Sequence, residues 1–265
     1  MLIGAYSHER PPGETKQPAA GQWVIYYGNM MISPRDVQIL HQVHRFGQLT
    51  SHHIRVLEFP VQRSATSLYN VLRRLTAAGM LTQVEKRGIG GWKGGSGQWV
   101  YQLGTKGYNF LEVEAAARRR RVTMDEHAIG IADVYVATVE AERRGELVIH
   151  SAQIEREGLI RLGEVELIPD LTLYLHVAAR GQDGRLFVEV DTGWENRAKI
   201  EEKLRRYYHL YRNWPHETFP RIVFLSTSEY KMPMLRKKID RAPEEVRPLF
   251  YVDYLGNFPA LLTAI

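Results

Sequence analysis

The order of periodic segments between residues 33 and 103 constrains the fold of this chain more than any other feature. Apolar residues recur at helical spacing in three segments, and two segments with strand-like alternation follow around a glycine-rich tip. The helices are expected at about 33–46, 50–57 and 64–78, and the strands at 81–86 and 98–103. Three helices followed by a hairpin predict a winged helix-turn-helix, with the hairpin as its wing.

Capping residues support the boundaries of the first two helices. Ser33 precedes Pro34, and Asp36 follows three residues after the serine, which is the residue order of a capped helix start. Gly47 is placed to end this helix, and Thr50 is placed to cap the second. These boundaries therefore depend on backbone chemistry as well as on hydrophobic periodicity.

The polar face of the third helix suits the major groove of DNA. A helix fits this groove, where guanidinium and short polar side chains reach base edges and phosphates, and a basic hairpin tip reaches the flanking backbone. The alternative is a solvated helix face, or a winged helix used for protein contact. The expected DNA contacts are Arg63, Ser67, Asn70, Arg73 and Arg74 on the helix, with Arg87 and Lys93 on the wing.

Two further segments flank this unit. Residues 1–30 are polar, rich in proline and glycine and without a period, so we expect most of this segment to be a flexible arm. Near its end, Trp23, Ile25, Tyr26 and Tyr27 are large enough to pack against another part of the chain. A connector at 105–123 is expected to form a helix from about Thr105 to Arg121. Its four terminal arginines either complement the helix dipole or grip DNA phosphates at the domain junction. They are Arg118, Arg119, Arg120 and Arg121.

Charge is divided unevenly along the chain. Residues 1–123 contain 16 Lys and Arg against 7 Asp and Glu, whereas residues 124–265 contain 19 against 23. A basic N-terminal half attracts a polyanion, and an acidic C-terminal half needs a metal ion to approach one. The chain has no cysteine, no apolar run long enough for a membrane span and no signal-peptide pattern, so we expect a cytoplasmic protein without membrane contact.

From residue 124 the pattern changes to a long helix followed by alternating strands and helices. Helix, two or three antiparallel strands, helix and strand is the order of a restriction-endonuclease-like core, so we expect an α+β protein with a mixed sheet in domain 124–265, after a winged helix-turn-helix domain at 31–104. The expected helices are 124–143, 195–213 and 231–240, and the expected strands are 147–154, 167–177, 186–190, 221–226 and 250–254.

Two carboxylates are expected to meet on neighbouring strands of this sheet. Asp170 stands early on one central strand and Glu189 near the end of the next. Such a pair holds Mg²⁺ or Mn²⁺ against a phosphodiester, where the ion polarises the phosphate and lowers the pKa of the attacking water. A separation of more than about 8 Å between the two carboxylates would exclude this metal site.

The lysine that usually accompanies such a pair stands two residues after the glutamate, and Asp191 occupies that position here. Lys199 and Lys203 share one face of the following helix with Glu195. One interpretation is that Lys203 reaches back to replace the missing lysine, with Asp191 as an additional metal ligand. The other is an exposed Glu-to-Lys ladder on a fold that binds DNA without cutting it.

Four segments together resemble the replication-relaxation family of plasmid and mobile-element proteins, which is similar to the MobC-type relaxases. They are His127–Asp133, Ile168–Asp170, Phe187–Glu195 and Lys203–Tyr207, within a similarity that spans about residues 33–255. The resemblance implies a winged helix before a PD-(D/E)XK nuclease-like domain, and metal-dependent nicking of DNA during plasmid replication or conjugative transfer.

The resemblance also assigns residues. It matches His127 and Asp133 to the first-helix pair of the family, Asp170 to its aspartate, and Glu189, Asp191 and Glu195 to its acidic strand-to-helix run. Ala132 stands where the family has an asparagine.

Two functional hypotheses remain open. The first is a metal-dependent nicking endonuclease, and the second is a non-catalytic replication initiator or transcriptional regulator whose nuclease-like half serves assembly as a homodimer. Double-stranded DNA is the expected partner in both. Tyr207 and Tyr208 are interpreted as packing residues on a largely apolar helix face, not as nucleophiles.

Overall fold

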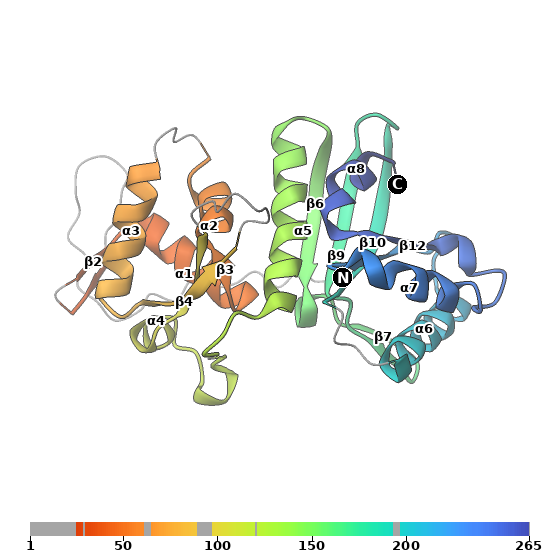
Figure 1. Ribbon diagram of the computed structural model, residues 1–265, viewed down its shortest axis with the longest axis horizontal. Coiled ribbons are helices and arrows are strands. Elements are labelled where there is room, and N and C mark those ends of the chain that lie inside the picture. Colours follow the sequence, from red (N-terminus) through yellow and green to blue (C-terminus); the bar gives the residue numbers. More distant parts are fainter. Residues whose placement is uncertain are drawn as a thin grey trace.

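The computed structural model describes residues 25–28, 30–60, 65–88, 97–119, 121–192 and 197–264. Figure 1 shows an N-terminal region and a C-terminal region on either side of a long helix, α5 (Glu126–Arg143). Within the described ranges, no helix combines the length and hydropathy that a membrane crossing requires. The fold is mixed α+β, as the sequence predicts.

The N-terminal region contains the expected three helices and hairpin, in the expected order. They are α1 (Pro34–Phe46), α2 (Ser51–Glu58), α3 (Ala65–Ala77), β4 (Leu81–Arg87) and β5 (Gln98–Leu103), with a short strand β3 (Leu49–Thr50) that also pairs with β5. Both predicted caps are confirmed, because Ser33 and Asp36 form a capping box on α1 and the Thr50 side chain accepts a hydrogen bond from the backbone of His53 on α2.

The flexible arm expected at 1–30 is wrong for its last residues, and residues 1–24 lie outside the described chain. β1 (Ile25–Tyr27) pairs antiparallel with β2 (Met30–Ile32). Tyr27 packs edge-on against Phe110, with ring centroids 5.3 Å apart. Aromatic packing orders this hairpin although the residues before it carry no periodic pattern.

The connector helix expected over 105–121 is also wrong. α4 (Thr105–Phe110) ends after six residues, and the chain turns at Glu112, whose φ is 54°. The backbone of Arg121 donates to the Gln102 side-chain oxygen, and the Gln102 amide donates to the Arg121 carbonyl oxygen. This exchange satisfies backbone groups of Arg121. The arginine run follows a single 3-10 turn, η1 (Ala115–Ala117), and not the end of the long α-helix that was expected.

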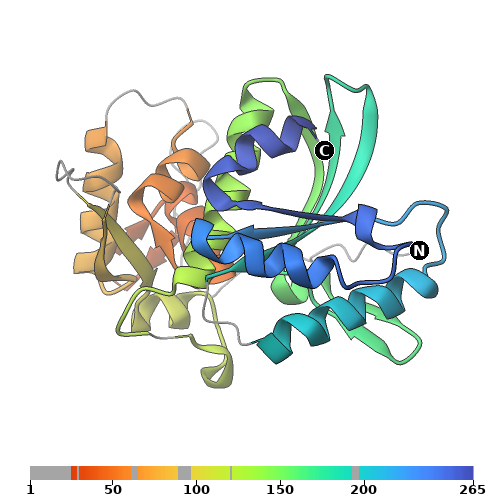
Figure 2. The same ribbon diagram turned by 45° about the vertical axis from the view of Figure 1, so that its right-hand side comes forward.

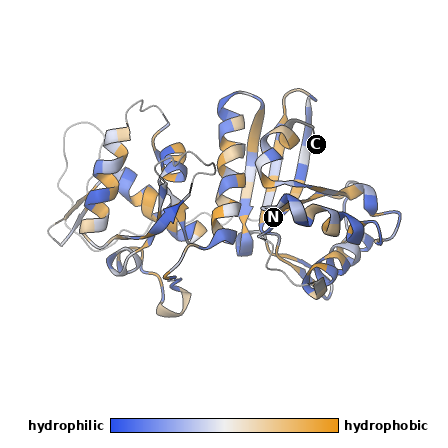
Figure 3. Ribbon diagram, in the orientation of Figure 1, coloured by the Kyte–Doolittle hydropathy of each residue, from blue (hydrophilic) through white to orange (hydrophobic). Residues whose placement is uncertain are grey.

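Helix α5 is buried on nearly all sides. Ile129, Ile131, Val134 and Val136 are each 3% exposed or less, although they point in different directions around the helix. Figure 3 shows hydrophobic residues along α5 and along the strand beside it. One hydrophobic cluster accordingly runs from the N-terminal helices through α5 to the C-terminal sheet.

The C-terminal region is built on a five-stranded mixed sheet. The strands are β6 (Leu147–Ile154), β9 (Leu171–Val177), β10 (Gln182–Asp191), β11 (Arg221–Ser226) and β12 (Phe250–Tyr254). They lie in the order β12-β11-β10-β9-β6, with antiparallel pairing from β6 to β10 and parallel pairing from β10 to β12. Every predicted strand is therefore present, although the segment expected at 167–177 is interrupted at Asp170.

Helices cover both faces of this sheet (Figure 2). α6 (Arg197–Arg212) and α7 (Met232–Ile239) pack on one face through Tyr207, Leu210 and Ile239. α5 and α8 (Phe258–Ala264) pack on the other. An additional hairpin that the sequence reading missed, β7 (Ile160–Leu162) with β8 (Val165–Leu167), lies against α6.

Candidate active site

The register of β9 and β10 brings Asp170 to Glu189. Leu171, the first residue of β9, is opposite Val188 of β10, so the residue before β9 comes beside the end of β10. The backbone N–H of Val190 donates to Asp170 Oδ2 at 2.7 Å. Because side chains alternate along a strand, Glu189 and Asp191 share the face covered by α6 and α7, while Val190 packs toward α5.

Two residues of α6, one helical turn apart, contact Glu189. Lys203 Nζ lies 2.6 Å from Glu189 Oε2 and 4.0 Å from Asp170 Oδ2. The Tyr207 hydroxyl donates to Glu189 Oε1. Residues four apart lie on one face of a helix, so α6 presents both groups to the carboxylate.

Burial and charge act in opposite directions on the two carboxyls. Burial, together with the negative charge of Asp170, raises the pKa of Glu189 to about 8. Burial would also raise the pKa of Asp170, but its hydrogen bonds and the charge of Lys203 lower that pKa below its ordinary value. Burial raises the pKa of Tyr207, which keeps its hydroxyl protonated as a donor. The site thus holds Asp170 as an ionised carboxylate beside Glu189, whose ionisation requires a nearby positive charge.

His127 of α5 completes the contacts of Asp170. Its Nε2 lies 3.3 Å from Asp170 Oδ1, and its Nδ1 lies 3.1 Å from the carbonyl oxygen of Val190. Burial opposes protonation of this imidazole, but the hydrogen bond and charge of Asp170 outweigh it and raise the pKa of His127 to about 9. A protonated imidazole donating to both oxygens is consistent with these contacts.

The residues present suit a hard divalent cation. The two Lys203 distances place a Glu189 oxygen and an Asp170 oxygen no further apart than the sum of 2.6 and 4.0 Å, which is below the limit of about 8 Å. Oxygen ligands of this kind are those that Mg²⁺ and Mn²⁺ prefer. Asp191 is 4% exposed on the same face of β10.

A model of the replication-relaxation family matches residues 40–222, which is more than half of the chain and includes Asp170, Glu189 and Lys203. The chain belongs to the replication-relaxation family. No curated protein and no solved structure matches it. Membership points to a role in the replication or mobilisation of a plasmid or other mobile element.

Not every expected site residue of this replication-relaxation protein lies in the carboxylate site. Asp133 points elsewhere, because six residues on α5 separate it from His127 by about 120° around the helix. It accepts from both guanidinium nitrogens of Arg87 at 2.7 Å, and it lies 2.8 Å from His53 Nε2. Asp133 and Arg87 therefore join α5 to strand β4 of the N-terminal hairpin.

The remaining predicted catalytic residues are placed as follows. Lys199 is exposed on α6 and lines a cavity of about 700 Å³ between β8 and α6, together with Lys203 and Arg206. Glu195 lies outside the described residues. Of the two helix lysines considered from the sequence, the one that contacts the carboxylates is Lys203.

The predicted DNA contacts differ in the partners that the rest of the chain gives them, and several of the paired arginines are themselves exposed. Ser67, Asn70 and Arg73 are exposed on α3. Arg74 lies 2.6 Å from the fully buried Asp36 and donates to the carbonyl oxygen of Met31, which makes it a structural residue of the N-terminal region. The arginine run also has partners within the chain. Arg118 donates to Asn109, Arg119 lies 2.8 Å from Glu155, and Arg121 lies 2.8 Å from Asp125. Arg63, Lys93 and Arg120 lie outside the described residues.

Sequence reasoning missed the polar role of Tyr207. Its place on an apolar helix face predicts a packing residue, and its ring does pack against Phe187. Its hydroxyl nevertheless donates to Glu189. The sequence feature that could have predicted this role is the spacing of four residues between Lys203 and Tyr207, which puts both side chains on one helix face.

Proposed function

We propose that this protein is a metal-dependent DNA-nicking endonuclease of the relaxase-like kind, which acts in replication or mobilisation of a mobile element. The observation that carries the proposal is the convergence of Asp170 just before β9, Glu189 of β10 and Lys203 of α6. A carboxylate pair with a lysine is the residue set that phosphodiester cleavage with a divalent ion requires.

The order of elements supports a restriction-endonuclease-like core. Helix α5, the antiparallel strands β6, β9 and β10, then α6 and the parallel strand β11 follow one another as such a core requires. The carboxylates stand where β9 begins and β10 ends. The proposal therefore combines a fold order with a site in the corresponding position.

In this proposal Asp170 and Glu189 hold Mg²⁺ or Mn²⁺, which supplies Lewis-acid polarisation of the phosphate and a water of lowered pKa. Tyr207 keeps the Glu189 carboxylate oriented through its hydrogen bond. Lys203, whose side chain is 21% exposed, presents a cation at the border between the buried carboxylate and the cavity beside β8. An ammonium at that border attracts a phosphate and stabilises negative charge that develops on it.

DNA binding is part of the same proposal. The exposed polar residues of α3 supply a surface for double-stranded DNA, and the excess of basic residues in the first 123 positions supplies attraction to the phosphate backbone. Within this surface, Arg73 is exposed and its guanidinium donates to Asn70 of the same helix face.

A second function is favoured by one specific observation. Asp191, not a lysine, stands two residues after Glu189, and it is buried. An acid at this position favours a DNA-binding replication initiator or regulator that keeps the fold without cutting. The choice between the two functions depends on whether Lys203 serves as the lysine of the site.

Cleavage of supercoiled plasmid distinguishes the two functions. The substrate carries the DNA that flanks the gene, and the reaction is run with Mg²⁺, with Mn²⁺ and with EDTA. The wild type is compared with an Asp170→Ala, Glu189→Ala double variant. Metal-dependent conversion to open circles that the double variant lacks supports the nicking enzyme, whereas salt-sensitive binding without conversion supports the regulator.

A further inference from the structure

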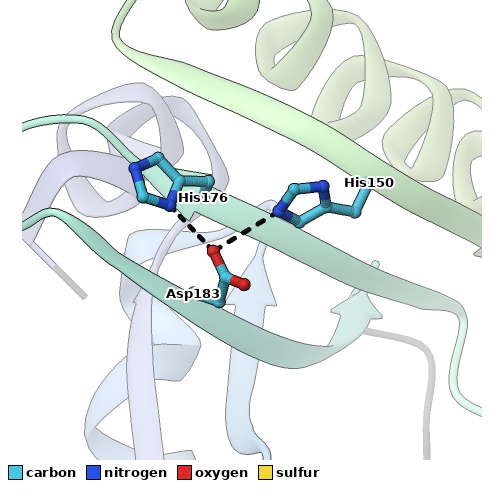
Figure 4. A group of neighbouring side chains, drawn as sticks. All are labelled: His150, His176 and Asp183. Carbon is cyan, nitrogen blue, oxygen red and sulfur yellow. Dashed lines mark hydrogen bonds and ion pairs between the residues drawn. The ribbon is translucent and has the colours of Figure 1, made fainter.

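Three potential metal ligands converge on adjacent strands at a distance from the carboxylate site. His150 of β6, His176 of β9 and Asp183 of β10 each offer one ligand atom, and these atoms all lie within 4.8 Å of one another. Figure 4 shows both imidazoles directed at the same carboxylate oxygen of Asp183. No residue of this cluster is among those that the family resemblance assigns.

The strand register explains the convergence. His176 is directly opposite Asp183 in the antiparallel β9–β10 pair. A bulge in β6 between Ile149 and Ser151 sets His150 beside the same pair. Opposed residues on neighbouring strands have Cβ atoms about 5 Å apart, which is close enough for two side chains to share one ion.

The distances suit a small ion with nitrogen and oxygen ligands. Asp183 Oδ1 lies 2.8 Å from His176 Nδ1 and 3.4 Å from His150 Nε2. Ligands about 2.0–2.1 Å from a tetrahedral Zn²⁺ are about 3.3 Å from one another. Small rotations of the three side chains would therefore bring their ligand atoms around a common centre.

A neighbouring tyrosine orients the carboxylate of this cluster. The Tyr174 hydroxyl donates to Asp183 Oδ2 at 2.9 Å, which leaves Oδ1 toward the two imidazoles. The Tyr174 ring lies 4.7 Å from that of His150, and Arg185 lies over the same ring at 5.0 Å. A hydrogen bond to the second oxygen of a ligating carboxylate is the usual outer support of a metal site.

We propose that His150, His176 and Asp183 form a site for a divalent transition-metal ion of the Zn²⁺ class. Two imidazoles and one carboxylate suit Zn²⁺, Fe²⁺, Co²⁺ and Ni²⁺ better than Mg²⁺, so this site and the oxygen-rich site at Asp170 select different ions. The three side chains are 37–46% exposed, which leaves the outward positions of the ion to water. A bound ion would link β6, β9 and β10.

The test is calorimetric titration of the tag-free full chain with ZnCl₂ after EDTA treatment and removal of the chelator. We expect His176→Ala and His150→Ala to raise the Kd of one Zn²⁺ equivalent by at least about 100-fold, because even the loss of a hydrogen-bond partner behind a ligand lowers metal affinity by about 10–100-fold. Tyr174→Phe should raise it by about tenfold. His209→Ala, an exposed histidine on α6, is the matched control and should leave the titration unchanged.

A second comparison separates this site from the carboxylate site. The Asp170→Ala, Glu189→Ala double variant should retain the Zn²⁺ equivalent that His176→Ala loses, whatever its effect on DNA cleavage. Circular dichroism in EDTA checks that each variant is folded. Equal Zn²⁺ binding by wild type and both histidine variants, or loss of the equivalent only in the double carboxylate variant, would overturn the proposal and leave a His–Asp–His hydrogen-bond cluster.

Discussion

Lys203 on α6 places its Nζ 2.6 Å from Oε2 of Glu189 on β10, so the cation beside the buried carboxylate comes from the helix and not from the strand. The position on the strand where a lysine would be expected holds Asp191. Glu189 is 1% exposed, and an unpaired charge at that depth is costly. The helix lysine therefore compensates a carboxylate that the strand itself does not neutralise.

Removing this lysine should reduce DNA cleavage. We expect Lys203→Ala to lower the nicking rate by about 100-fold or more, because a single group that stabilises transition-state charge contributes on that order. Lys199→Ala, one turn earlier on the same helix and exposed, is the control and should change the rate less than about threefold. Equal rate losses in both variants, measured on supercoiled plasmid, would assign the effect to general attraction of DNA.

Loss of the Tyr207 hydroxyl should affect both stability and metal affinity. Tyr207→Phe leaves a buried acceptor on Glu189 without its donor, so we expect the free energy of unfolding to fall by about 1–2 kcal/mol. Mg²⁺ affinity should fall by about tenfold, because the carboxylate loses the group that orients it. Urea unfolding and Mg²⁺ titration measure the two effects. Tyr208→Phe, whose hydroxyl lies 3.4 Å from Glu245, is the control, and a matching loss in it would contradict this role.

Substitution of two adjacent arginines on α3 should affect two different properties, DNA binding for Arg73 and stability for Arg74. Arg73→Ala should weaken DNA binding with little effect on stability. The slope of the logarithm of the binding constant against the logarithm of salt concentration should become smaller by about one, the value for one released counterion. Arg74→Ala leaves the fully buried Asp36 without its guanidinium, so we expect a loss of about 2–3 kcal/mol in the free energy of unfolding. Fluorescence anisotropy at several salt concentrations and thermal unfolding separate the two effects. Unchanged DNA affinity in Arg73→Ala would exclude this face of α3 as the DNA contact.

The contact of Asp133 with Arg87 of strand β4 should make stability depend on pH. Burial opposes ionisation of Asp133, but hydrogen bonds from His53 and Arg87 outweigh it and lower its pKa below 3.8. A depressed folded-state pKa contributes stability that is present above the unfolded value and is lost as pH falls through the folded one. We therefore expect Asp133→Asn to be less stable than wild type by about 2–4 kcal/mol at pH 7.

The same comparison at lower pH tests the sign of this effect. The difference between wild type and Asp133→Asn, measured by urea unfolding, should shrink progressively below about pH 4, because the Asp133 carboxyl takes up its proton in the unfolded state before it does so in the folded state. A difference that stays constant between pH 7 and pH 3 would mean that charge on Asp133 is not its source. Glu146→Gln, which removes a partly exposed partner of the exposed Arg144, is the control and should show little difference at either pH.

The sequence by itself determined much of the local structure, although not the segment after Phe110 or the β7–β8 hairpin. The capping box at Ser33, the alternation of β9 and the places of Asp170 just before β9 and of Glu189 within β10 are all encoded within a few residues of where they act. Periodicity was sufficient to predict the five strands of the C-terminal sheet. Such features depend on backbone geometry that neighbouring residues set.

Only the tertiary structure decided which distant residues meet. The packing of α6 on the sheet brings Lys203 to the carboxylates. The packing of α5 near strand β4 directs Asp133 to Arg87 and away from the carboxylate site. The register of β6 and its bulge bring His150 to His176. These contacts depend on helix packing and strand register, which are set by burial over the whole core and are not encoded at any single position.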